Sequence, residues 1–212
     1  MSPFWRRVAL AYGRWRVRRS LDGLHVNGLD HARTALAEGP VVFASTHVSW
    51  WDGVLMVVLD GELGTDARFL MDAGNLEKLS MFRAIGAIAL DRTSRSSARR
   101  GLVTARAHLA GPGVGVWIFP QGRQRPRSVR PLGLHRGALA LPRQGGRIVP
   151  VTLNYGFRES HMPTAVVTFE PPLEAETSID ALEAALISGI ERADRFLDGE
   201  TEGFTTLIPS RH

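Results

Sequence analysis

The 212-residue chain contains no cysteine, and its 26 basic residues include a single lysine, Lys78. The lack of cysteine excludes disulfides, thiolate metal ligands and cysteine nucleophiles. No run of about 18 apolar residues, the length that a transmembrane helix needs, occurs, and no apolar segment of signal-peptide type stands near the start. Internal repeats are also absent. With a hydrophobic share of 44%, the composition indicates one domain with a substantial core.

The first segment of the chain combines basic and aromatic residues. The stretch PFWRRVALAYGRWRVRRS has six arginines, two tryptophans and no acidic residue. We interpret residues 1–22 as a basic amphipathic helix that lies on a membrane surface, because tryptophan-rich basic segments partition into lipid headgroups. A solvated arm or a nucleic-acid-binding arm is the alternative. We expect peripheral attachment to the cytoplasmic side of a membrane, and no nucleic-acid partner.

From Val41 onward, β-branched runs alternate with helical patterns. Strands are expected over residues 41–46, 68–73, 87–91, 114–120, 147–155 and 164–170. Short helices are expected over residues 75–86 and 135–141, a further helix from a cap at Ser94 or Ser96 to a stop at Gly111, and a closing helix over residues 178–197. This alternation predicts an α/β domain with a mixed, mostly parallel sheet flanked by helices. In such sheets the loops after the strands form the site. Here these loops contain STHVSWWD, LDRTSR and FPQGRQRPR.

The first of these loops contains a histidine and an aspartate five residues apart, His47 and Asp52. On one regular helix their side chains would point about 140° apart, so a contact requires His47 in a loop and Asp52 in the first turn of the following helix. Ser49 and Asp52 resemble a capping box with Ser49 as the N-cap. The alternative is purely structural: Asp52 complements the helix N-terminus and His47 fills the turn.

A histidine paired with an aspartate suits one kind of chemistry. The imidazole accepts a proton near neutral pH, and the carboxylate fixes its tautomer and stabilises the imidazolium. The chain has no cysteine and no serine in a nucleophile-elbow pattern, so the pair would activate a hydroxyl supplied by a substrate. This indicates group transfer onto an alcohol.

Two further loops are rich in arginine. Arg92 follows Asp91 at a strand end, where a structural ion pair is the simpler interpretation. The loop after the strand 114–120 carries four arginines and no acid: Arg123, Arg125, Arg127 and Arg130. Such a loop is suited to binding the phosphates of a donor or a lipid headgroup, whereas the alternative is a flexible solvated loop.

Four blocks, taken in order, resemble the glycerolipid acyltransferase superfamily, which includes the lysophosphatidate and glycerol-3-phosphate acyltransferases. That family carries N-H-x4-D, G-x-I-x-[IV]-D-R, F-P-E-G-T-R-S and V-P-V blocks. This chain has THVSWWD (46–52), GAIALDR (86–92), FPQGRQR (119–125) and IVPV (148–151), and LHRGALAL (134–141) resembles a further F-K-x-G-A stretch. The resemblance covers roughly residues 41–155.

The resemblance implies that residues 23–212 form an acyltransferase domain. His47, oriented by Asp52, would deprotonate an acceptor hydroxyl, which attacks the thioester of an acyl-CoA or acyl-carrier protein without a metal, another cofactor or an acyl-enzyme. The implied partners are a membrane lipid acceptor, the acyl donor and the lipid surface. The implied substrate-binding residues are Arg92, Phe119, Pro120, Gln121, Gly122, Arg123 and Arg125.

The third block departs from the family pattern. The family glutamate is replaced by Gln121, its threonine by Arg123 and its arginine by Gln124. Gln121 carries no charge, so the acceptor is either lysophosphatidate-like or a non-phosphate lipid such as a glycosylated carotenoid or another glycolipid.

Two rival classes are a metal-dependent hydrolase and a non-catalytic lipid-binding protein. A metal-dependent hydrolase would need a second histidine cluster, which this sequence does not have. A non-catalytic lipid-binding protein would not explain the four blocks. Trp50 and Trp51 either line a substrate entrance or anchor the helix.

Overall fold

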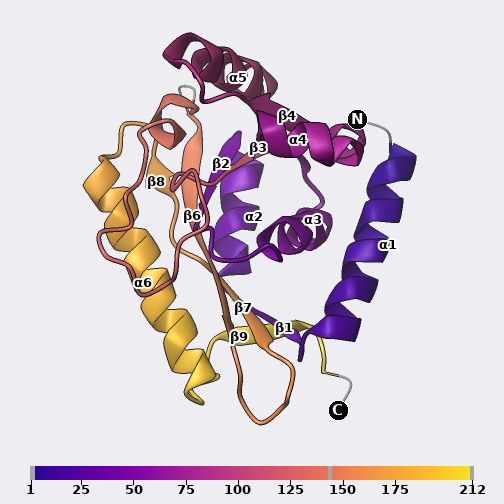
Figure 1. Cartoon of the computed structure of the whole chain (residues 1–212). Coiled ribbons are helices and arrows are strands. Elements are labelled where there is room, and N and C mark those ends of the chain that lie inside the picture. The colour runs from indigo at the N-terminus through magenta and orange to yellow at the C-terminus, as the bar shows by residue number, and fades with distance from the viewer. Residues whose placement is uncertain (1–2, 143–144, 211–212) are drawn as a thin grey trace.

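In the computed structural model, which describes residues 3–142 and 145–210, helices cover both faces of a nine-stranded sheet (Figure 1). The strands are β1 (Leu24–Asn27), β2 (Val41–Ser45), β3 (Asp66–Asp72), β4 (Ala87–Leu90), β5 (Val114–Ile118), β6 (Arg147–Gly156), β7 (Thr164–Phe169), β8 (Leu173–Glu174) and β9 (Phe204–Ile208). The α-helices are α1 (Pro3–Ser20), α2 (Leu29–Glu38), α3 (Asp52–Leu63), α4 (Ala73–Lys78), α5 (Arg95–His108) and α6 (Ile179–Leu197). Two 3-10 helices are η1 (Ser80–Ile85) and η2 (Ala138–Ala140).

The sheet is mixed and mostly parallel, which confirms the predicted fold class. Its order is β4-β3-β5-β2-β6-β7-β1-β9, and β8 pairs with β6. Five pairings are parallel, namely β3–β4, β3–β5, β2–β5, β2–β6 and β1–β7. The other three, β6–β7, β6–β8 and β1–β9, are antiparallel. Because β2 lies between β5 and β6 and runs parallel to both, the loops that follow these three strands meet at one edge.

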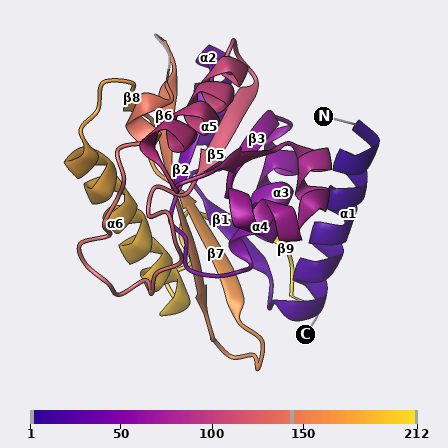
Figure 2. The ribbon, with the colours of Figure 1, turned by 45° about the horizontal axis from the view of Figure 1, so that its top comes forward.

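The sheet is buried on both faces by two separate hydrophobic clusters. In β2 the side chains alternate between them: Val41 and Phe43 pack under α2 and α3, whereas Val42 and Ala44 pack under α5 and α6. Figure 2 shows α6 on one side of the sheet and α3 on the other. Burial on both faces explains why β2 reads as an unbroken apolar run rather than an alternating one.

The helix α1 packs against α3 rather than against the sheet (Figures 1 and 2). Val17 and Gly13 lie on its inner face, where a Cβ at Gly13 would be 3.1 Å from a Val58 methyl group. On the same side Arg6 pairs with Asp60 at 2.7 Å, and Arg14 pairs with Glu62. The predicted division of the chain at residue 22 stays a prediction.

Several predicted elements have different bounds. The single helix expected around residues 75–86 is two pieces, α4 and η1, and the helix expected at residues 135–141 is only the 3-10 turn η2. Of the two caps expected for α5, Ser94 or Ser96, the structure has Ser94, and the helix ends at His108 rather than at Gly111. The sequence did not predict the strands β1, β8 and β9.

Candidate active site

The loop from β2 to α3 brings His47 and Asp52 together, as the sequence predicts. His47 lies in the loop after β2, and Asp52 is the first residue of α3. The His47 Nδ1 and Asp52 Oδ2 atoms are 2.7 Å apart. The Asp52 side chain has no solvent exposure, whereas that of His47 is 22% exposed. The carboxylate is therefore shielded, while the imidazole is open on one side.

The prediction that Ser49 is the N-cap of this helix is wrong. The helix begins at Asp52 with Trp51 in the cap position, and Trp51 makes no side-chain cap hydrogen bond. The Ser49 hydroxyl instead accepts from the Trp51 N–H at 3.2 Å, which closes a turn before the helix. This turn sets the backbone direction that brings Asp52 back toward His47.

The Asp52 carboxylate accepts hydrogen bonds from several donors besides His47. Its Oδ2 accepts from the backbone N–H groups of Val48 and Ser49 at 2.7 and 2.9 Å. Its Oδ1 accepts from the Tyr155 hydroxyl at 2.8 Å. A buried carboxylate is stable as an anion only when its oxygens are hydrogen-bonded or paired in this way.

The loop after β5 holds His47 in place. The imidazole stacks on the Phe119 ring, with ring centroids 4.1 Å apart and 12° between the planes. Gln121, which is 2% exposed, accepts from the His47 N–H through Oε1 at 2.7 Å. The Arg125 N–H donates to the His47 carbonyl at 2.8 Å. The main chain and the ring of His47 are thus both fixed by the FPQGRQR block.

The other predicted binding residues lie around the same turn. Gly122 has φ of +66°, which favours glycine, and a Cβ there would be 2.6 Å from a terminal nitrogen of Arg92. Arg92 also reaches Asp72 at 3.3 Å, as the ion-pair alternative for it suggests. The Pro120 carbonyl accepts from the His135 N–H at 2.8 Å. The proposed role of these residues in substrate binding stays a prediction.

The loop arginines divide into two groups. The Arg125 guanidinium lies against Gly133, where a Cβ would be 2.9 Å from it, while Arg123 is exposed. Arg127 pairs with Asp194 of α6 and lies 3.3 Å from the Asn154 side-chain oxygen. Arg127 therefore ties the loop to α6, which the sequence did not predict.

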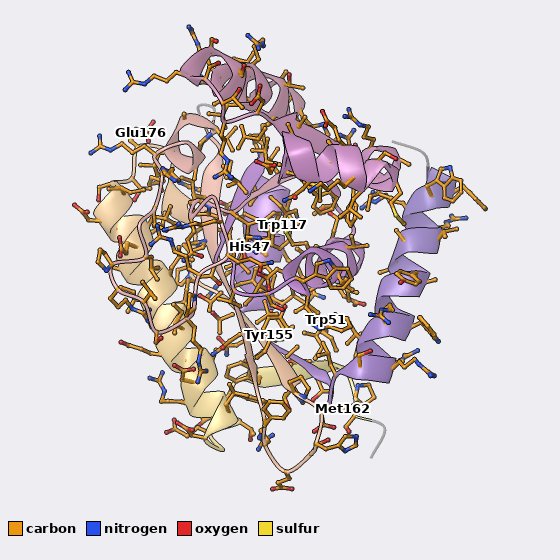
Figure 3. The ribbon with its side chains drawn as sticks, in the orientation of Figure 1. His47, Trp51, Trp117, Tyr155, Met162 and Glu176 are labelled. Carbon is orange, nitrogen blue, oxygen red and sulfur yellow. The ribbon has the colours of Figure 1, made fainter. Side chains whose placement is uncertain are left out.

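The two tryptophans have different surroundings. Trp50 is 60% exposed, whereas Trp51 packs against the core and lies under the Arg16 guanidinium, 5.2 Å from the ring centroid. In Figure 3, Trp51 lies on the α1 side of His47. Trp51 also lines a hollow of about 340 Å³, together with Val48, Ser49, Pro126, Arg127, Asn154, Tyr155 and Pro163. Trp51 thus anchors the start of α3 by packing against the core, whereas a role of the two tryptophans in lining a substrate entrance stays a prediction.

Sequence reasoning did not find Tyr155. This residue lies near the end of β6, an apolar strand that runs parallel to β2, so its position at the carboxyl end of the strand was the available signal. Burial, and then the adjacent Asp52 charge, raise the pKa of Tyr155 well above its ordinary value of 10.0. The phenol is therefore a permanent hydrogen-bond donor. The His135 ring and the Arg92 guanidinium both lie against Gly122.

The arrangement supports base chemistry at one atom. With Nδ1 donating to the carboxylate, the other ring nitrogen, Nε2, keeps its lone pair and can accept a proton. No group of three or more His, Asp or Glu side chains suited to a metal ion occurs in residues 3–142 and 145–210. Over the same residues, no helix has the length and apolar composition to cross a bilayer.

Comparison with known proteins places this site in a family. The family model named Acyltransferase matches residues 23–154, which include the dyad and the FPQGRQR block. No curated protein matches the chain. Among solved structures, the chain is similar to the 1-acyl-sn-glycerophosphate (LPA) acyltransferase PlsC from Thermotoga maritima, with a TM-score of 0.61 and 15% identity. That match covers 89% of this chain and 79% of the other.

The structural match supports the fold, and the family model covers more than half of the chain. The chain belongs to the Acyltransferase family and is an acyltransferase.

Proposed function

We propose that the enzyme moves a fatty acyl group from acyl-CoA or acyl-carrier protein to a hydroxyl of a membrane lipid. The observation that carries this proposal is the contact between His47 Nδ1 and Asp52 Oδ2 at 2.7 Å, because it leaves Nε2 free to act as a base. The similar PlsC structure is described as an acyltransferase for 1-acyl-sn-glycerophosphate, which supports a lipid acceptor.

The proposed reaction needs no covalent enzyme intermediate. Nε2 of His47 takes the proton of the acceptor hydroxyl while its oxygen attacks the thioester carbonyl carbon. The Asp52 carboxylate stabilises the imidazolium that forms. The tetrahedral intermediate then collapses with cleavage of the carbon–sulfur bond, and the imidazolium returns its proton to the departing thiolate. The products are an ester and a free thiol.

For the acceptor, we favour a lysophosphatidate-like lipid over a non-phosphate one. The neutral amide of Gln121 is the sequence feature that suggested a change of acceptor. Its oxygen, however, is bonded to the His47 N–H, a task that a glutamate oxygen would perform equally well. The replacement therefore carries little information about acceptor charge. Arg92 beside Gly122 and Arg125 beside Gly133 supply cationic groups near the dyad that suit a phosphate.

The second candidate is a non-phosphate acceptor such as a glycosylated carotenoid or another glycolipid. The observation in its favour is that Arg92 already contacts Asp72 and Arg127 already pairs with Asp194, which neutralises part of the positive charge near the site. A test with both acceptor classes decides between them.

We also propose that α1 attaches the enzyme peripherally to the cytoplasmic side of a membrane, where both soluble donors are available. At 100° per residue, Val8, Tyr12 and Trp15 point about 140–200° away from the inner residue Leu10. These three residues are 43%, 53% and 47% exposed, and Phe4 and Trp5 are 64% and 51% exposed. The helix thus presents its aromatic face outward, while Arg6 and Arg14 face inward to acids of α3.

The function is tested by acyl transfer with purified protein and labelled acyl-CoA or acyl-carrier protein. Lysophosphatidate and a glycolipid serve as acceptors. We expect His47→Ala to lower kcat by about 100-fold or more, because a positioned general base contributes about 10²–10⁴-fold. Asp52→Asn should also lower it strongly. His161→Ala, which changes an exposed histidine, is the control. Parent-like transfer by folded His47→Ala would rule out the dyad mechanism.

A further inference from the structure

The Asp52 carboxylate has two oxygens with unequal surroundings. Oδ2 receives three N–H donors, namely the His47 imidazole and the backbone groups of Val48 and Ser49. The donor that the structure gives to Oδ1 is the hydroxyl of Tyr155, at 2.8 Å. Because Asp52 has no exposure, water does not supply a replacement at Oδ1 without opening the site. The orientation of the carboxylate about its last side-chain bond therefore depends on Tyr155.

Tyr155 is placed for this task by the sheet. It stands near the end of β6, which runs parallel to β2 with Ser45 opposite Val151. The antiparallel partner β7 holds the other side of β6, where Tyr155 is opposite Ala165. Two neighbouring strands thus fix the phenol at the carboxyl edge of the sheet. Tyr155 also lines the hollow beside Trp51.

We propose that Tyr155 is a positioning residue for the reaction, one that holds Asp52 in the orientation that keeps the His47 proton on Nδ1. This inference rests on the proposed function, since it assigns a role within the same His47–Asp52 mechanism. Tyr155 acts through Asp52, and the base remains His47. The phenol stays protonated because burial, and then repulsion by the adjacent carboxylate, disfavour its ionised form.

Loss of the Tyr155 hydroxyl should shift the pH dependence of activity in one direction. Without the Tyr155 donor, Oδ1 is an unpaired buried anion, so the carboxylate becomes more basic and attracts a positive charge more strongly. The imidazolium form of the dyad is then favoured over the neutral form that accepts the substrate proton. On acidification, the Tyr155 variant should therefore lose activity at a higher pH than the parent does. The less constrained carboxylate also orients His47 less well.

The test compares Tyr155→Phe with Thr104→Val, which removes a hydrogen-bonded hydroxyl from an exposed position of α5, away from the site. For Tyr155→Phe we expect kcat to fall about tenfold with KM changed less than about twofold, because one hydrogen bond to a charged group is lost. The midpoint of the acid limb should move to higher pH. Thr104→Val should keep the kcat and pH profile of the parent.

A purely structural role would lower the melting temperature of Tyr155→Phe and leave the acid limb in place. That result, or an unchanged kcat, overturns the proposal. Failure of this proposal can be told apart from failure of the proposed function, because the proposed function is tested by His47→Ala.

A second measurement covers the case in which Tyr155→Phe does not fold. In Tyr12→Phe the only tyrosine is Tyr155, so its ionisation is followed by tyrosinate absorbance after rapid alkaline pH jumps. Adding Asp52→Asn should make this tyrosine ionise at lower pH, because the adjacent charge is removed. Identical titrations in the two proteins would show that the hydroxyl does not serve Asp52.

Discussion

At the scale of single residues, the site is organised around one buried negative charge. Asp52 accepts from His47, Val48, Ser49 and Tyr155, and these donors come from the β2–α3 loop and from β6. Hydrogen bonds to a charged acceptor are the strong kind, and each needs its donor placed within a few tenths of an ångström. The dyad is therefore as rigid as the sheet edge that carries it, and changes at neighbouring residues should be visible in the rate.

Gln121 offers a direct check of this rigidity. In Gln121→Met the His47 N–H loses its acceptor, which costs about 1–3 kcal/mol when the group stays away from water. We expect kcat to fall about tenfold, since His47 then shifts relative to Asp52. Gln121→Glu keeps an oxygen at the same place and should transfer acyl groups at close to the parent rate. Steady-state kinetics with both variants provide the measurement.

The matched control for these variants is Gln124→Met, three positions further along the same loop, where the side chain is exposed. It should behave like the parent in both kcat and melting temperature. If Gln121→Met were equally active, the contact with His47 would have no bearing on catalysis.

The sequence was informative about residues whose partners are near in the chain or in a shared motif. His47 and Asp52 are five residues apart, and their pairing follows from a loop running into a helix. Tyr155 lies 103 residues from Asp52, and their contact exists only because β6 pairs with β2 in a particular register. No local pattern contains that register, so the residue could be suspected only from its place at a strand end.

At the scale of elements, strands and long helices follow from apolar periodicity, whereas their ends depend on single hydrogen bonds. The closing helix α6 begins after Ser178, whose hydroxyl accepts from the Ala181 N–H, as a cap should. Ser49 has the same local signature, but its hydroxyl closes a turn with Trp51 while Asp52 turns toward His47. The turn that brings Asp52 to His47 thus takes the place of the expected cap.

The α1–α3 contact permits a test of how a buried charge fixes an element. Asp60 is 4% exposed, and burial raises its pKa above the ordinary value of 3.8 despite its bonds to Thr65 and Arg6. Arg6→Ala leaves this charge uncompensated and should lower the free energy of unfolding at pH 7 by about 2 kcal/mol. Asp60→Asn removes the buried charge itself, so it should cost less than about 1 kcal/mol.

The raised pKa of Asp60 determines how the stability loss in Arg6→Ala changes with pH. A raised pKa means that the folded protein binds the Asp60 proton more tightly, so this group favours folding at low pH and less so as the pH rises through its folded pKa. The loss caused by Arg6→Ala should therefore shrink as the pH is lowered toward 4. Urea unfolding at several pH values is the measurement. If Arg6→Ala and Asp60→Asn lost the same free energy of unfolding at every pH, burial would not be the main cause of the raised Asp60 pKa.

At the scale of the whole molecule, the order of the strands decides which loops meet. After β2 the chain adds β3, β4 and β5 on one side, and then places β6 on the other side of β2. The point where the direction reverses is where His47, Phe119 and Tyr155 come together. Sequence patterns predicted the strands β2 to β7 and a mostly parallel sheet. They contained no information on the strand order, because order is set by long-range packing of the two cores.

The outward aromatic face of α1 is the remaining large-scale feature that the fold itself does not use. A lipid surface suits it, because α1 has no acidic residue, its last turn carries Arg18 and Arg19, and tryptophan and tyrosine favour the headgroup region. The double variant Trp5→Ser and Trp15→Ser should reduce sedimentation with anionic phosphatidylglycerol vesicles by about tenfold or more, since each indole contributes on the order of 1–2 kcal/mol of apolar burial.

The control for this variant is Val103→Ser, which removes a 58% exposed apolar side chain from α5, on another part of the molecule. It should sediment like the parent. Transfer to a vesicle-bound acceptor should fall in the double variant, while transfer to a monomeric short-chain acceptor stays unchanged, because the dyad is untouched. Unchanged vesicle binding, or a concentration-dependent dimer that the double variant abolishes, would show that the face of α1 serves a protein contact instead of a membrane.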